Sequence, residues 1–196
     1  MEQAGPTVER VPAGRVDQAV AALTVAFADD PVSRWMYPSA QGYLAHFPAL
    51  VRAFGVSAFE SGGARSVHAM AGVALWLAPS LHPDEVALAA ILQRDVPESL
   101  RDEAGALFAQ MDGYHPHRPH WYLPLIGVDP MERGRGFGSL LLEAPLVECD
   151  RARQPAYLES TNPRNVSLYQ RHGFEVLGTI RVGSAPPMIP MLREPR

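Results

Sequence analysis

Residues 121–142 read WYLPLIGVDPMERGRGFGSLLL. The segment from Trp121 to Val128 is mostly apolar and is closed by Asp129-Pro130, which is typical of a buried strand that ends in a turn. The apolar run Leu140 to Leu142 follows a glycine-rich segment and begins a helix. The stretch therefore predicts a strand, a loop and a helix in immediate succession.

The loop between this strand and this helix has few side chains that would exclude a ligand. Gly134, Gly136 and Gly138 stand at alternate positions, so the backbone can take positive φ values and a ligand can come close. The amide N–H groups of the loop then lie at the positive end of the helix dipole. Arg133 and Arg135 add positive charge. This combination favours binding of a phosphate or pyrophosphate group.

Two common phosphate-binding patterns do not fit this loop. The dinucleotide fingerprint G-x-G-x-x-G needs a glycine where Ser139 stands, and the Walker pattern needs a lysine, which the chain lacks. The pattern Arg/Gln-x-x-Gly-x-Gly/Ala does fit, with Arg133, Gly136 and Gly138. On these residues the segment resembles the acetyl-coenzyme A loop of the GNAT superfamily of N-acetyltransferases.

A second motif lies downstream of the first. Residues 165–174 read NVSLYQRHGF, which is similar to the GNAT segment N-x-x-x-Y-x-x-x-G-F and places Asn165 and Tyr169 on a helix. The preceding Leu158-Glu159-Ser160 resembles the strand before that helix. Residues 26–31 and 73–76 resemble the puromycin-acetyltransferase-like branch of the superfamily.

The resemblance implies an α/β fold in a single acetyltransferase domain over residues 1–196. We expect a mixed central sheet of about seven strands, flanked by helices. Two strands, Trp121 to Val128 and Ala156 to Ser160, would be parallel neighbours that splay apart. The pantetheine arm of acetyl-coenzyme A would enter the gap between them.

Acetyl-coenzyme A is the implied co-substrate. Backbone groups of residues 126–128 would pair with the pantetheine amides as a missing strand would. Residues 133–139 would hold the pyrophosphate, and Asn165 would bond to the cofactor arm. The predicted cofactor-binding residues are Ile126, Gly127, Val128, Arg133, Gly134, Arg135, Gly136, Phe137, Gly138, Ser139 and Asn165.

The implied reaction is direct transfer of an acetyl group to a primary amine of a small molecule. An alkyl ammonium has a pKa of about 10, so a base or a water chain must remove its proton. We expect Tyr169 to be the general acid at the sulfur. Glu159 is expected to be the base or a substrate-binding group. The alternatives are a core tyrosine with a satisfied hydroxyl and an ion pair between Glu159 and an arginine.

Three more residues are candidates for binding the acceptor. His120 is a reserve candidate for the base. Trp35 lies in a segment, residues 31–38, that the sequence predicts to be a loop, where it would line an amine pocket or cap the core. Trp76 would be a pocket wall or a core residue.

A second class of function stays open beside the enzyme. The same fold can bind an acyl-coenzyme A or a drug without turnover, as a sensor or sequestering module. A donor longer than acetyl is a further alternative, because nothing in the sequence sizes the acyl pocket.

Composition excludes several classes of partner. The net charge of −4 gives no reason to expect nucleic acid or an anionic membrane as a partner. The one cysteine, Cys149, excludes an internal disulfide, and the histidines 115, 117 and 120 lie on a Pro-rich loop with no ligand set, so we expect no metal. With no signal segment in view, we expect a cytoplasmic protein, bacterial by its Arg, Ala and Pro content, and a monomer or homodimer.

The remaining elements follow from apolar periodicity and from Pro and Gly positions. We expect strands over residues 7–10, 66–70, 73–77, 175–182 and 188–192, and helices over residues 14–28, 41–59, 83–94, 97–111 and 138–153.

Overall fold

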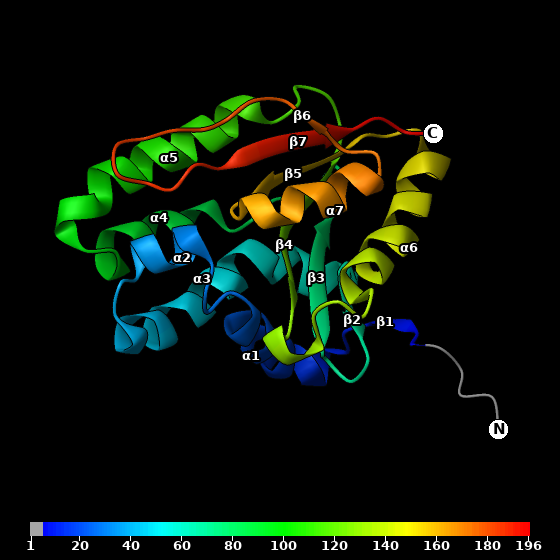
Figure 1. Ribbon diagram of the computed structural model, residues 1–196, viewed down its shortest axis with the longest axis horizontal. Coiled ribbons are helices and arrows are strands. Elements are labelled where there is room, and N and C mark those ends of the chain that lie inside the picture. The colour runs from blue at the N-terminus through cyan, green and yellow to red at the C-terminus, as the bar shows by residue number, and fades with distance from the viewer. Residues whose placement is uncertain (1–5) are drawn as a thin grey trace.

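A single mixed sheet forms the centre of the computed structural model, which describes residues 6–196 (Figure 1). The seven strands run in the order β1-β2-β3-β4-β5-β7-β6. All neighbours are antiparallel except β4 and β5, which are parallel. The strands are β1 Val8–Arg10, β2 Ala64–Val67, β3 Gly72–Leu77, β4 Trp121–Val128, β5 Ala156–Ser160, β6 Glu175–Val176 and β7 Ile189–Arg193.

Helices cover both faces of this sheet. Helices α1 and α3 lie behind it in Figure 1, whereas α6 and α7 lie in front. Helices α4 and α5 extend the first layer beside α3. The helices are α1 Val16–Ala26, α2 Pro31–Met36, α3 Ala40–Ser61, α4 Glu85–Asp95, α5 Arg101–Tyr114, α6 Phe137–Ala152 and α7 Val166–Arg171. These two layers confirm the predicted α/β fold with helices on either side of a mixed sheet.

Strand β3 is buried along its whole length, because helices pack on both of its faces. Its alternate side chains divide between two cores. Val73, Leu75 and Leu77 belong to the core under α1 and α3, whereas Ala74 and Trp76 belong to the core under α6. The continuous apolar sequence of this strand follows from that double burial.

The parallel pair β4–β5 holds together over a very short length. Its aligned residues are Trp121 with Ala156 and Tyr122 with Tyr157. Beyond them the two strands diverge (Figure 1). The structure thus confirms the predicted parallel pair. Among the described residues, no strand pairs with the later part of β4 at the edge that faces β5.

The segment predicted to be a loop at residues 31–38 contains a helix instead. Asp30 caps α2 by accepting a hydrogen bond from the Ser33 amide at 2.9 Å, and Pro31 takes the first helical position. Proline ends a preceding helix but also suits the first turn of a new one, where its missing N–H costs nothing. The loop prediction was therefore wrong.

Two strand predictions also differ from the structure. Strand β2 ends at Val67, because His68, Ala69 and Met70 take positive φ values and form the turn into β3. The predicted strand over residues 175–182 reduces to β6 and an isolated bridge between Ile180 and Met188. Strand β7 lies between β5 and β6, so β6 is an edge strand and its short length limits its exposed hydrogen-bonding groups.

Among residues 6–196, no helix combines the length and apolar character that crossing a bilayer requires. The domain predicted over residues 1–196 begins with five residues that lie outside the described part of the chain.

An ion pair ties α6 to the last strand of the sheet. The Arg193 guanidinium, whose side chain is 5% exposed, donates to both carboxylate oxygens of Asp150 at 2.7 and 2.8 Å. Its Nε donates to the His172 carbonyl at 2.9 Å, which adds the end of α7 to the same contact. The hydrogen bond from Arg193 holds the pKa of Asp150 below the usual aspartate value.

We expect Asp150→Asn to lower the free energy of unfolding by about 2 kcal/mol at neutral pH, because a hydrogen-bonded charge pair loses one charge. A carboxyl with a depressed folded pKa contributes stability above its ordinary pKa and loses it as the pH falls. The difference between variant and wild type should therefore shrink as the pH falls below the usual value of 3.8. Urea unfolding at several pH values measures it.

The matched control is Glu194→Gln. Glu194 pairs with Arg118, but both side chains are more than half exposed, at 58% and 53%. An exposed pair contributes less than about 1 kcal/mol. Equal losses in the two variants would contradict a special role for the buried pair.

Candidate functional site

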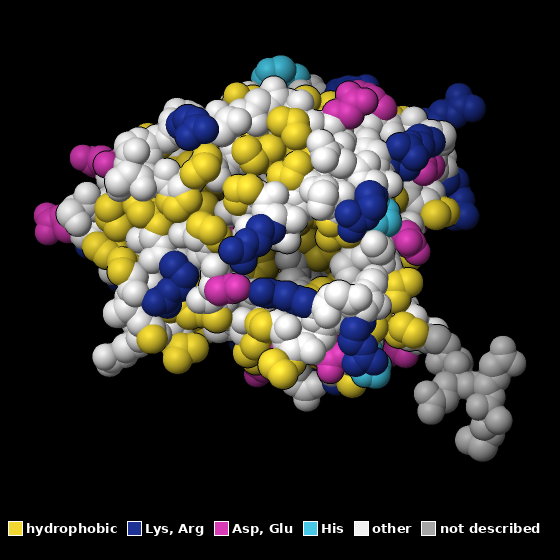
Figure 2. Space-filling model, viewed as in Figure 1, with side chains coloured by type: hydrophobic (Ala, Val, Ile, Leu, Met, Phe, Trp, Pro, Cys, Tyr) yellow, Lys and Arg dark blue, Asp and Glu magenta, His cyan; other side chains and the backbone are white. Residues whose placement is uncertain are grey.

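A cleft of about 580 Å³ opens where β4 and β5 separate. Figure 2 shows it as a hollow at the centre of the face that carries α7. Its walls are the end of β4, the glycine loop with the first turn of α6, helix α7, and the connection between α1 and α2. The lining includes Phe27, Asp29, Asp30, Ile126, Gly127, Val128, Arg133, Gly134, Gly136, Phe137, Gly138, Ser139, Asn165, Leu168 and Tyr169.

The glycine loop has the backbone conformation that its sequence predicts. Gly134 and Gly136 both have φ of 81°, and Gly136 immediately precedes α6. A Cβ at Gly138 would lie 3.1 Å from Leu168 Cδ2, so the start of α6 packs closely against α7. The first helical turn, residues 137–139, lines the cleft, and the free amides at a helix N-terminus suit an anion there.

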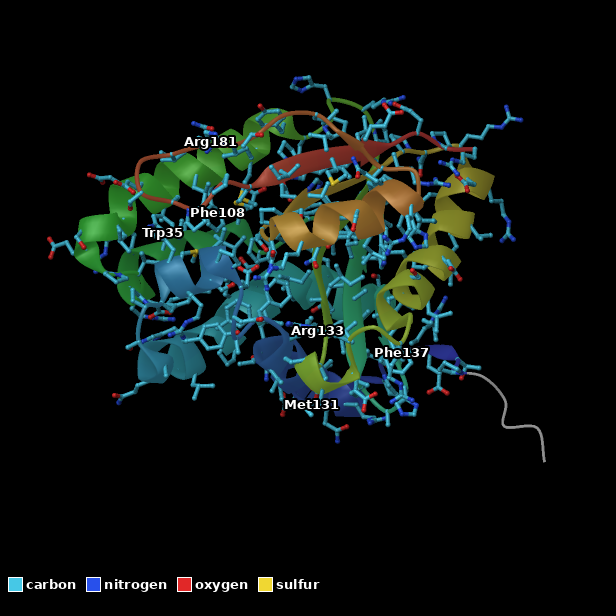
Figure 3. All side chains as sticks on the ribbon, in the orientation of Figure 1. Trp35, Phe108, Met131, Arg133, Phe137 and Arg181 are labelled. Atoms are coloured by element: carbon cyan, nitrogen blue, oxygen red, sulfur yellow. The ribbon has the colours of Figure 1, made fainter. Side chains whose placement is uncertain are left out.

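The two arginines of the loop are both engaged with carboxylates. Arg133 donates to Asp29 at 3.0 and 3.1 Å and to the Ala26 carbonyl at 3.1 Å, so it reaches from the loop to the end of α1 across the cleft. It lies at the centre of this face in Figure 3. The hydrogen bond from Arg133 lowers the pKa of Asp29.

Arg135 points away from the cleft. It forms an ion pair with Glu132, and its Cζ lies 5.3 Å from the centre of the Phe137 ring. It is absent from the residues that line the cleft. The anion site therefore consists of backbone amides first, and the side chains of Arg133, Arg164 and Arg171 belong to the same lining.

Tyr169 projects from α7 into the cleft and is 5% exposed. Burial raises the pKa of its phenol, and the nearby Asp30 carboxylate raises it further. The hydroxyl therefore keeps its proton at neutral pH and can donate it. Asn165, at the start of the same helix, also lines the cleft.

Asp30 is a buried carboxylate that sequence reasoning did not select. One of its oxygens accepts from the amide and the hydroxyl of Ser33, and the other accepts from the Thr161 hydroxyl at 2.5 Å. Burial raises its pKa, although these hydrogen bonds act in the opposite direction. The available signal was an Asp-Pro pair at a helix start, where an aspartate side chain is a preferred cap.

A second pocket, of about 60 Å³, adjoins the cleft. Phe27 lines both cavities, and Thr161 of the second pocket bonds to Asp30 of the first. The lining of the second pocket is almost entirely apolar: Phe27, Val32, Met36, Phe47, Leu50, Phe54, Leu107, Phe108, Met111, Tyr122, Pro124, Leu125 and Met188, with Ser33, Thr161 and Glu159 as polar members.

Glu159 is the charged member of that lining. Its side chain is 2% exposed, and its Oε1 lies 3.3 Å from His115 Nε2. Within the described residues Oε1 accepts no hydrogen bond. Burial and then the negative charge of Glu159 raise the pKa values of the Tyr122 and Tyr157 phenols. The charged neighbour of Glu159 is thus a histidine, whereas the alternative to a catalytic role predicted an ion pair with an arginine.

The other candidates for acceptor binding lie outside both linings. Trp35, on α2, donates to the Ser184 hydroxyl at 3.0 Å. Trp76 is 1% exposed in the core under α6 and donates to the Leu141 carbonyl at 3.3 Å. His120 does not reach the pocket, but its Nε2 lies 3.1 Å from His115 Nδ1. The side chains of the two tryptophans therefore pack outside both cavities.

The part of the chain that the structure describes holds no group of three or more His, Cys, Asp and Glu side chains that could bind a metal ion.

Comparison with known proteins identifies relatives of this chain. Residues 98–176 match the family model of the acetyltransferase (GNAT) domain. An uncharacterised N-acetyltransferase of Schizosaccharomyces pombe is 26% identical over 209 aligned positions, which cover 95% of this chain and 83% of the relative. A mycothiol acetyltransferase of Propionibacterium freudenreichii is 38% identical over 96 residues, but these are 44% of this chain and 29% of that protein.

Solved structures agree with the sequence relatives. A Corynebacterium glutamicum protein described as a histone acetyltransferase HPA2 and related acetyltransferase superposes with a TM-score of 0.70 at 27% identity, over 98% of each chain. The arylalkylamine N-acetyltransferase 2 of Aedes aegypti also reaches 0.70, at 16% identity, over 98% of this chain and all of its own. The family model and these neighbours support a GNAT acetyltransferase domain and confirm the predicted fold.

The pH dependence of the free energy of unfolding should reveal that burial raises the pKa of Asp30. A carboxyl whose folded pKa is raised loses stability as the pH rises from its ordinary pKa to the folded value. Asp30→Asn keeps a capping oxygen but does not titrate, so its free energy of unfolding should gain on that of the wild type above pH 3.8. Asp30→Ala should show the same pH dependence but lie about 1 kcal/mol below Asp30→Asn at every pH, because the cap is gone. A pH-independent difference for Asp30→Asn, measured by urea unfolding, would refute this account.

Proposed function

We propose that this chain is an acetyl-coenzyme A-dependent N-acetyltransferase that moves an acetyl group directly to a primary amine of a small molecule. One observation carries the proposal. The cleft runs from the anion site at α6 to the protonated phenol of Tyr169, and it adjoins an apolar pocket that contains one buried carboxylate. A phosphate site, an acid and a base for an amine would thus lie along two adjoining cavities.

The shape of the cleft suits the co-substrate. Backbone without a Cβ at Gly134, Gly136 and Gly138 leaves room for a pyrophosphate beside the free amides of α6. The edge of β4 that faces away from β3 has no partner strand over residues 126–128, so its backbone groups can pair with the two amides of pantetheine. The thioester of acetyl-coenzyme A supplies the acetyl group.

The residues of the chain supply the proton chemistry. Glu159 would accept a proton from the acceptor ammonium, whose ordinary pKa is about 10, so that a neutral amine can attack. A backbone N–H near Val128 would stabilise the oxyanion that develops. Tyr169 would donate its proton to the departing thiolate.

The second pocket favours a particular class of acceptor. Its lining is apolar and aromatic around a single carboxylate, which suits a primary amine carried on an aryl or alkyl group. The Aedes aegypti neighbour is named for arylalkylamines, and we propose the same class of substrate here.

The remaining sequence predictions stay proposals. They include membership of the puromycin-acetyltransferase-like branch, one domain over residues 1–196, a cytoplasmic and bacterial protein, a monomer or homodimer, and no nucleic-acid or membrane partner. A sensor that binds acyl-coenzyme A without turnover remains the alternative. The sequence and the cleft dimensions also leave open a donor longer than acetyl.

Gly136→Ala tests the anion site. At a φ of 81° an alanine costs about 1–2 kcal/mol of strain, so the loop should leave this conformation and affinity for acetyl-coenzyme A should fall roughly tenfold. Titration calorimetry measures the affinity. The control is Gly105→Ala in α5, where an added Cβ has nothing within 4 Å; affinity should not change. Unchanged affinity in Gly136→Ala would mean that the loop does not bind the cofactor.

Tyr169→Phe tests the acid. Loss of the donor should lower kcat by about 100-fold or more, because general acid catalysis contributes on that scale. Affinity for acetyl-coenzyme A should stay within about threefold, since a hydroxyl aimed at the sulfur adds little binding. Tyr37→Phe is the control, because Tyr37 is equally buried but lines neither cavity. A normal kcat for Tyr169→Phe would remove it from this role, whereas a wild type that binds but never transfers would favour the sensor.

A further inference from the structure

Three titratable side chains form a line from the apolar pocket towards the surface. Glu159 Oε1 lies 3.3 Å from His115 Nε2, and His115 Nδ1 lies 3.1 Å from His120 Nε2. His120 Nδ1 lies 2.8 Å from the carbonyl of Arg118, an exposed residue. Both histidines come from the connection between α5 and β4, where the sequence indicated His120 alone, as a reserve candidate for the base.

Exposure increases along this line. The Glu159 side chain is 2% exposed, the His115 side chain is 27% exposed, and Arg118 is on the surface. Aromatic rings fix the orientation of His115, because the Tyr157 and Tyr122 ring centres lie 4.4 and 4.6 Å from its own. The imidazole nitrogens are therefore held in line with their neighbours.

The hydrogen-bonding chemistry of the neighbours determines where the protons lie. A carbonyl only accepts, so His120 Nδ1 must carry the hydrogen that faces the Arg118 carbonyl. Burial lowers the pKa of His120, so its ring is neutral at neutral pH and its Nε2 accepts. His115 Nδ1 must then donate to that Nε2.

The contact between His115 Nε2 and Glu159 Oε1 holds no hydrogen bond, although the two atoms lie 3.3 Å apart. A His115 ring that donates from Nδ1 has a lone pair at Nε2, and a carboxylate oxygen also offers only lone pairs. Two facing lone pairs leave room for one proton between them. Glu159 and His115 thus form a pair that can take up one proton, beside the pocket.

We propose that His115 and His120 are positioning residues that connect Glu159 to solvent and carry the acceptor's proton out of the pocket. The inference rests on the proposed acetyl transfer. The N–H bond of the ammonium breaks as its proton goes to Glu159, and the proton is shared with His115 Nε2. His115 passes its Nδ1 proton to His120 Nε2, His120 releases its Nδ1 proton to water, and both rings return to their Nδ1–H tautomers before the next turnover. One proton enters and one leaves in each turnover.

Other titratable groups around the line set its electrostatics. Tyr122 of β4 and Tyr157 of β5 face Glu159, and their phenols stay neutral because burial raises their pKa values. Tyr114 of α5 adjoins Tyr157. His82 adds a small repulsion that lowers the pKa of His120. Thr161, which donates a hydrogen bond to Asp30, lines the second pocket together with Glu159.

The kinetic test uses the full chain with acetyl-coenzyme A and 2-phenylethylamine. His115→Gln should lower kcat/KM for the amine by about 10-fold or more at pH 7, with the KM for acetyl-coenzyme A unchanged. The loss should shrink towards pH 10, because the amine then loses its proton in solution. Glutamine places an amide near Glu159 but cannot relay a proton. If His115 had only a structural role, His115→Gln would therefore keep the activity of the wild type. A loss that is equal at every pH, or no loss, would overturn the proposal.

His117→Gln is the matched control for that test. His117 lies on the same connection, is exposed, and takes no part in the line. Its kcat/KM and pH profile should match those of the wild type, and His120→Gln should follow His115→Gln with a smaller loss. The same profile change in His117→Gln would show that any substitution in this loop has the effect, which would also overturn the proposal.

A second measurement does not depend on turnover. Imidazole ¹⁵N NMR should find the Nδ1–H tautomer at both His120 and His115, because each ring donates from Nδ1 along the line. An Nε2–H tautomer at either ring would overturn the relay even with an active enzyme. Wild type that shows the relay but neither binds nor turns over acetyl-coenzyme A would instead refute the proposed function.

Discussion

The separation of β4 from β5 is the constraint on which the rest of the site depends. The two strands share only two aligned residue pairs before they diverge. Beyond that point the backbone of β4 has polar groups without a strand partner on one side, and such groups need water or a ligand. The cleft, the open edge of β4 and the approach to the second pocket all follow from this one departure from regular pairing.

Helices on both sides keep this gap from closing. The apolar faces of α1 and α3 pack against one side of β3 and β4, and α6 packs against the other. Because interiors are close-packed, the strands cannot move together without displacing these helices. The gap is thus a fixed part of the fold, and α7 covers it from the front (Figure 1).

Charge is distributed unevenly around the gap. The two arginines of the glycine loop are paired with carboxylates, Arg133 with Asp29 and Arg135 with Glu132. Deeper inside, no arginine among the described residues pairs with Asp30 or Glu159; Ser33 and Thr161 donate to Asp30, and His115 lies beside Glu159. Asp30 stabilises the start of α2 as its cap, whereas the surroundings of Glu159 suit proton transfer better than stability. The buried thiol of Cys149, whose pKa burial raises to about 12, takes no part in this chemistry.

The sequence by itself determined the strand, glycine loop and helix at residues 121–142, the helix with Tyr169, and the resemblance to GNAT acetyltransferases, because each depends on neighbours within a few positions. Glycine spacing and apolar periodicity act locally, so they can be read along the chain. Only the tertiary structure decided that Asp30 caps a helix at the cleft, that Trp76 belongs to the core, and that Glu159 meets His115. These contacts join elements far apart in the chain, and side-chain orientation across a packed sheet depends on strand order and on register, which local pattern does not specify.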